Sequence, residues 1–219
     1  MEQLLQVLLW IHAGSGFVCL LAGIAALASR KAAGSHPRAG RIFTGALISA
    51  YVAILLGIIL ERNVFMLGIG ALAVYAGVDG RRSLQRFKGE LPATATGFDH
   101  ALSGACALFS VGLGAYGAWV VATTGNMLGA VCIAFAILGG VLVRGSRSRL
   151  GGQTSRNGWL AAHIGLMSGA FSAAVTAFFA VQFSGRIGGL EWILWVAPTV
   201  VMMVWSGRQT KRMGLEGVA

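Results

Sequence analysis

Seven long apolar stretches restrict the fold of this chain more than any other feature of its sequence. An α-helix needs roughly 20 apolar residues to cross the ~30 Å hydrocarbon core of a bilayer, and all seven stretches are long enough, the third and seventh being near the lower limit. The stretches cover residues 4–29, 42–61, 64–80, 99–123, 127–143, 159–184 and 190–206. Backbone groups in a bilayer must find partners within the chain, which favours helices. The sequence therefore predicts an all-α fold: one domain over residues 1–219, an integral membrane bundle of seven transmembrane helices.

The composition supports this class and excludes a soluble fold. Apolar residues make up 56% of the chain and charged residues 11%, against about 25% charged residues in an average soluble domain. The chain has 33 glycines, and small residues let membrane helices approach one another closely. Cys19, Cys106 and Cys132 each lie in an apolar stretch without metal-type or disulfide-type spacing, so we expect them to fill the core.

The distribution of lysine and arginine predicts the orientation. Fifteen of the 17 basic residues follow the first, third, fifth or seventh stretch, and only Arg62 and Arg186 fall on the other side. Basic residues mark the cytoplasmic side, so the N-terminus is expected outside and the C-terminus in the cytoplasm. The net charge of +10 then sets topology and meets anionic lipid headgroups at the basic loops. It does not indicate a nucleic-acid-binding surface.

Small residues mark faces where helices are expected to pack. In the sixth stretch Gly165 and Gly169 accompany Ser168, Ser172 and Thr176 at near-helical spacing, which favours close helix packing over a polar pathway. Two similar pentads, His12-Ala-Gly-Ser15-Gly16 and His100-Ala-Leu-Ser103-Gly104, occur in the first and fourth stretches, where their glycines are further packing candidates. An inverted repeat of three spans would produce this match, and so would chance.

Ionisable residues in or beside the apolar stretches are the candidates for function, because they are costly in a bilayer. Helix rise places Asp79, Asp99, His100 and His163 at one level near the cytoplasmic side, with His36 in the first cytoplasmic loop. Imidazoles and carboxylates together suit zinc, which would supply a hydroxide for hydrolysis. His100, His163, Asp79 and His36 are therefore the predicted ligands. Alternatively, the two aspartates pair with Arg81, Arg82 or other nearby cations.

Two further hypotheses use the same histidines. A haem b held by His100 and His163, on parallel spans, would make the chain an electron carrier. Proton transfer through His12, His163 and Asp99 would suit a coupled transporter, although a hydrogen bond to a neighbouring helix would equally satisfy His12. No span contains a lysine, which argues against a retinal protein. The motifs GxxxxGK[ST], HExxH and GxSxG are absent.

Two segments carry a resemblance to a known family. These are His36-Pro37-Arg38-Ala39-Gly40-Arg41-Ile42-Phe43 and the stretch from His163 to Phe178. They resemble bacterial membrane proteins of the domain of unknown function 2306. The resemblance covers about a third of the chain and implies a polytopic protein of the bacterial inner membrane in which His36 and His163 recur. The predicted topology also resembles, at the level of the fold alone, that of the seven-span zinc amide hydrolases of the alkaline ceramidase type. This sequence lacks the paired histidines that those enzymes carry on the last span.

The sequence thus leads to a bacterial inner-membrane protein with a His/Asp site near its cytoplasmic face. Its first predicted activity is metal-dependent hydrolysis of a lipid-like substrate. Haem-based electron transfer and proton-coupled transport of a small molecule are the alternatives, and the choice between enzyme, electron carrier and transporter stays open at this level.

Overall fold

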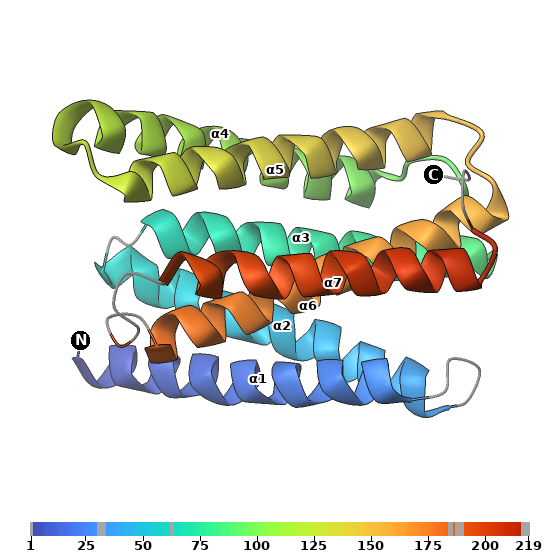
Figure 1. Ribbon diagram of the computed structural model, residues 1–219, viewed down its shortest axis with the longest axis horizontal. Helices are drawn as coiled ribbons and strands as arrows, with labels where there is room; N and C mark the ends of the chain where they lie inside the picture. The colour runs from blue at the N-terminus through green and yellow to red at the C-terminus, as the bar shows by residue number, and fades with distance from the viewer. Residues whose placement is uncertain (1, 30–33, 62–63, 184–185, 187–190, 216–219) are drawn as a thin grey trace.

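The computed structural model describes residues 2–29, 34–61, 64–183, 186 and 191–215, and at 58–61, 64–66, 191–192 and 195 the backbone alone. These residues form seven helices (Figure 1). Their bounds are α1 (Glu2–Ala28), α2 (Ser35–Glu61), α3 (Val64–Phe87), α4 (Gly97–Thr124), α5 (Met127–Gly151), α6 (Arg156–Phe183) and α7 (Glu191–Arg212). The all-α prediction and the seven helices are confirmed for the described residues.

Five of the helices are long and apolar enough to cross a membrane, namely α1, α2 as far as Gly57, α4, α5 and α6. Helices α3 and α7 are not among them when only the described residues are taken. The chain is therefore supported as a multi-pass membrane protein, while seven spans and their orientation stay predictions.

Several helices run past the apolar stretches from which they were predicted. Helix α3 continues to Phe87, α5 continues to Gly151, and α2 begins at Ser35. Arginine is a good helix former, and its long side chain can reach polar surroundings from a helix end. His36, which was predicted in a loop, consequently lies in the first turn of α2.

Helix α3 lies at the centre of the bundle. It packs against α2, α4, α5 and α6, whereas the antiparallel hairpin of α4 and α5 makes its main contacts with the rest of the chain through α3 (Figure 1). Short connections favour packing between consecutive helices, as seen for α1 with α2, α4 with α5 and α6 with α7, and α6 also packs against α3. The end of the bundle where α3 and α5 finish and α4 and α6 begin is called the arginine-rich end, on the right in Figure 1.

Two apolar clusters hold these groups of helices together. The larger joins α1, α2, α3, α6 and α7, with the rings of Phe43 and Phe171 edge to face at 6.2 Å. The smaller joins α3 to the α4–α5 hairpin through Leu72, Tyr75, Cys106 and Val143. The three cysteines are buried, as predicted.

Large apolar side chains also cover much of the outside of the bundle. Trp10 is 72% exposed, Leu108 73% and Val111 71%. In water such a surface would aggregate, whereas in a bilayer it is the surface that meets acyl chains. Their exposure agrees with the membrane assignment.

The closest helix approaches fall at glycines other than those predicted. A Cβ added to Gly16, Gly104, Gly165 or Gly169 would meet nothing within 4 Å. Ser168, Ser172 and Thr176 are buried as expected on the packed face of α6, whereas Gly165 and Gly169 lie on its exposed side. The tightest backbone approach is between Gly117 of α4 and Gly129 of α5, where an added Cβ on Gly117 would lie 2.6 Å from the Gly129 carbonyl oxygen.

We expect Gly117→Ala to destabilise the hairpin. The new methyl group would collide with backbone, which cannot rotate away, so the free energy of unfolding should fall by about 1–3 kcal/mol. Gly112→Ala is the matched control, because a Cβ there meets nothing within 4 Å on the same helix. Thermal unfolding of both variants in detergent measures the difference, and equal midpoints would refute the close approach.

Candidate functional site

Asp99 accepts hydrogen bonds from several donors at the arginine-rich end. Arg82 approaches both of its carboxylate oxygens, with Nε 2.7 Å from Oδ1 and Nη2 2.9 Å from Oδ2. Arg86 donates from Nη2 at 2.7 Å, and Thr96 donates from its backbone N–H at 2.8 Å and its hydroxyl at 2.7 Å. Thr96 is the N-cap of α4 and Asp99 its third residue, a capping box. The carboxylate therefore joins the end of α3 to the start of α4.

Asp79 makes a second ion pair, from α3 to α5. Its Oδ2 lies 2.8 Å from Arg149 Nη2, and Ser146 of α5 interacts with both Asp79 and Tyr75. The Tyr75 hydroxyl lies 3.3 Å from that of Ser103 on α4. Polar side chains of three helices thus meet inside the bundle.

We call Asp79, Arg82, Arg86, Asp99 and Arg149 the buried charge cluster. The side chains of Asp79 and Asp99 are 5% and 3% exposed, and that of Arg86 is 1% exposed. Three arginines face two aspartates, so one positive charge is in excess. The aspartates pair with arginines as the alternative interpretation expected, Asp99 with Arg82 and Arg86 and Asp79 with Arg149. Arg81, the other arginine named in that interpretation, is exposed and makes no ion pair with them among the described residues.

Some donors of this region have no partner among the described residues. They are Ser83 Oγ, Arg86 Nη1 and Arg149 Nε, all buried. A buried polar group without a partner costs about 1–3 kcal/mol, more when it is charged. These donors can therefore form hydrogen bonds to further acceptor atoms.

Three of the four histidines use Nδ1 in the same way. His12 donates to the carbonyl of Ala50, His36 to that of Ala26 and His163 to that of Gly80, each at 2.9 Å. Each bond runs from one helix to the backbone of another, α1 to α2, α2 to α1 and α6 to α3. The three histidines therefore link neighbouring helices through hydrogen bonds. This is the role that the sequence analysis gave as the alternative to proton transfer for His12.

The predicted metal and haem ligands lie on four different helices: Asp79 on α3, His36 on α2, His100 on α4 and His163 on α6. His100 is exposed near the start of α4, and α3 packs against both α4 and α6, which carry His100 and His163. The described residues contain no group of three or more His, Cys, Asp or Glu side chains suited to a metal ion. Asp79 is engaged by Arg149, and His36 lies against α1. The zinc and haem predictions thus gain no support here.

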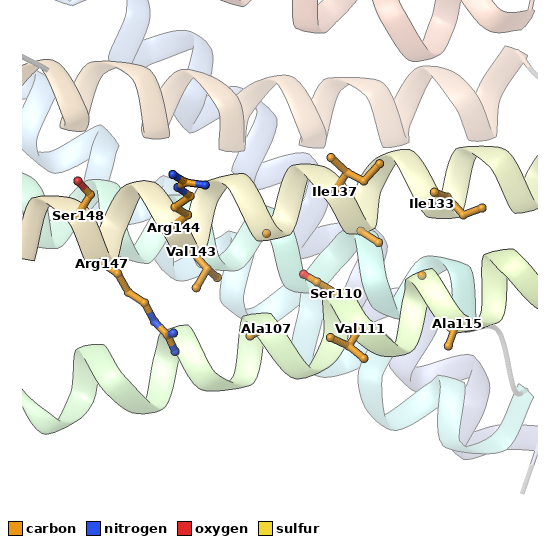
Figure 2. A pocket seen from close by; sticks show the side chains of 13 residues that line it. Ala107, Ser110, Val111, Ala115, Ile133, Ile137, Val143, Arg144, Arg147 and Ser148 are labelled. Carbon is orange, nitrogen blue, oxygen red and sulfur yellow. The ribbon is translucent and has the colours of Figure 1, made fainter.

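A groove of about 1010 Å³ runs between α4 and α5 and is open along one side (Figure 2). Ser110 and Val143 lie deep in it, while Val111 and Ile137 are exposed along it. Arg144, Arg147 and Ser148 close it at the arginine-rich end, and in Figure 2 the Arg147 side chain reaches from α5 toward α4. The remaining lining residues are small or aliphatic: Ala107, Gly114, Ala115, Ile133, Ala136 and Gly140. We call this the α4–α5 groove.

Sequence reasoning missed the groove and two of the five members of the buried charge cluster, Arg86 and Arg149. Arg86, Arg144, Arg147 and Arg149 had been used only as markers of orientation. The sequence did hold a signal for Arg149. Arg149 and Ser146 are one helical turn apart, so their side chains lie on the same face of α5. The groove gives no such signal, since alanine and glycine at its positions are common in any membrane helix.

Comparison of the chain with known protein families, curated proteins and solved structures found no match. The site is therefore interpreted from its own geometry.

We expect Asp99→Asn to destabilise the fold strongly. Arg82 and Arg86 would keep their buried charges and lose the carboxylate that balances them, which costs about 3–5 kcal/mol. Glu90→Gln is the control, because Glu90 is exposed and lies 3.8 Å from Lys88, a surface pair worth at most about 1 kcal/mol. Denaturant titration in detergent compares the two, and similar losses would contradict a buried cluster.

Proposed function

We propose that this chain is a seven-span protein of the bacterial inner membrane that binds an anionic phospholipid in the α4–α5 groove. The observation that carries the proposal is the division of the groove into a long apolar part and a basic end. Small and aliphatic side chains suit acyl chains, and Arg144 and Arg147 suit a phosphate. No carboxylate of the described residues pairs with either arginine.

The dimensions of the groove fit one leaflet. Ile133 and Val143 are ten positions apart on α5, which corresponds to about 15 Å at ~1.5 Å per residue. Half of a ~30 Å hydrocarbon core is also about 15 Å. Acyl chains lying along this part would bring a headgroup to the level of Arg144 and Arg147.

The orientation supports the same leaflet. With the arginine-rich end in the cytoplasm, as the distribution of 15 of the 17 basic residues predicts, the groove faces the cytoplasmic leaflet. Anionic lipids in that leaflet attract basic residues by about 1 kcal/mol each. The resemblance to the domain of unknown function 2306 agrees with this location and stays a prediction.

Binding, rather than hydrolysis, is the activity that the lining supports. The residues of the α4–α5 groove include no His, Asp, Glu or Cys, the groups that act as general bases or metal ligands. The hydrolase, haem and transport hypotheses would need His100 or His163, and neither lines it. We therefore propose lipid recognition without chemistry at this surface.

Reporter fusions test the first five spans and their orientation. Alkaline phosphatase, which is active only outside the cytoplasm, should be active when fused after Gly125 and inactive when fused after Gly152. Four spans precede the first position and five precede the second, starting from an external N-terminus. Loss of one predicted span before Gly125, such as α3, would reverse both activities and refute the topology.

Native mass spectrometry of the purified chain tests the lipid site. The double variant Arg144→Gln/Arg147→Gln should bind phosphatidylglycerol about thirtyfold more weakly, since two headgroup charges contribute ~2 kcal/mol. Binding of zwitterionic phosphatidylcholine should change little. The control is Arg81→Gln/Arg208→Gln, which removes two exposed arginines outside the groove.

A second pair of variants tests the apolar part. Gly140→Leu places a side chain in the groove at a position where a Cβ meets nothing within 4 Å, and Gly112→Leu is its counterpart outside the groove. Only Gly140→Leu should weaken binding of both lipids. If the control variants weakened lipid binding as much as the groove variants, lipid would be binding over the whole surface of the bundle and not in the groove, and the proposal would fail.

A further inference from the structure

A second and smaller pocket lies at the arginine-rich end, apart from the α4–α5 groove. Its volume is about 340 Å³, and it lies between the end of α3 and the beginning of α6. The pocket shares no lining residue with the groove. It is lined by Arg86, Phe87, Lys88, Gly89, Thr154, Arg156 and Trp159. We call it the α3–α6 pocket.

The charge of the α3–α6 pocket is entirely positive. Arg86, Lys88 and Arg156 line it, and no carboxylate does. Arg156 donates from Nε to the Phe87 carbonyl at 3.1 Å and lies 4.7 Å over the Phe87 ring, which fixes its position. Two carboxylates outside the lining balance part of this charge: Asp99 lies 2.7 Å from Arg86, and the exposed Glu90 lies 3.8 Å from Lys88. Such a lining attracts an anion.

Arg86 supplies an independent observation that points to an anion, because one of its buried N–H groups has no acceptor among the described residues. Its side chain is 1% exposed, with Nε 3.0 Å from the Pro92 carbonyl and Nη2 2.7 Å from Asp99. Its Nη1 has no partner among the described residues. Since Nε and Nη2 share one edge of the planar guanidinium, Nη1 is left on the other side of the group. The guanidinium lies 5.2 Å over the ring of Trp159, another residue of the pocket.

The backbone adds to the attraction. Helix α6 begins at Arg156, so the positive end of its dipole lies beside the pocket. The Thr154 hydroxyl donates to the Arg149 carbonyl at 2.8 Å, which ties the pocket to the buried charge cluster. Guanidinium groups beside a helix N-terminus match the geometry of phosphate oxygens.

We propose that the α3–α6 pocket binds a phosphate group. Arg86 and Arg156 would donate to its oxygens, Lys88 would add charge, and Trp159 would close one wall. The phosphate belongs either to a free anion or to the headgroup of a lipid, and the two sources share this chemistry. The proposal does not depend on the α4–α5 groove.

Calorimetric titration of the purified full-length chain tests it. The variant Arg144→Gln/Arg147→Gln serves as background, so that binding in the groove does not contribute. One arm uses inorganic phosphate against chloride at equal ionic strength, and the other uses short-chain phosphatidic acid. Saturable binding of phosphate identifies a free anion as a ligand, and binding of phosphatidic acid alone identifies a headgroup.

Adding Arg156→Gln to the background variant should raise the dissociation constant of the ligand that binds by about tenfold, which is the effect of losing one charge-assisted hydrogen bond. Arg156 is exposed, so the fold should survive, and Lys88→Gln is a second variant of the same kind. Arg208→Gln removes an exposed charge elsewhere and should change nothing. Absence of saturable binding in both arms, or binding that neither pocket variant weakens, would overturn the proposal.

Discussion

The ion pairs of Asp79 and Asp99 hold the α4–α5 hairpin on the rest of the protein. Helices surrounded by lipid gain no hydrophobic free energy from contacting one another, so packing and polar contacts must select the partner. The hairpin meets the bundle mainly through α3, across a small apolar cluster and these two carboxylates. Because the groove belongs to the hairpin, its position relative to the bundle is set by the same contacts.

The sequence predicted the helices well and their ends poorly. Apolar stretches locate the part of a helix that must avoid water, whereas the helices continue into arginine-containing turns that look like loops in a hydropathy pattern. The pairing of Asp99 with Arg82 could be foreseen, since they flank one short connection. The pairing of Asp79 with Arg149 joins residues 70 positions apart, and only the packing of α5 against α3 brings them together.

The candidate site was the least predictable part. Histidines in apolar stretches were correctly identified as needing partners, but His12 and His163 found backbone carbonyl groups, which every residue carries and no pattern reveals. A metal site requires side chains from several helices to converge. The sequence gives their depth in the membrane and not the order of helices around the bundle, where α3 packs against both α4 and α6.

The contact of Gly117 with Gly129 has a consequence for the order of assembly. The two residues are close in the chain, and the turn between them is fixed locally: Gly125 adopts the left-handed conformation at φ 64° and Asn126 caps α5. Local contacts form quickly because little chain entropy is lost in closing a short loop. Every lining residue of the groove lies between Ala107 and Ser148. During synthesis the groove can thus be complete, and open to lipid, before α6 and α7 have been made.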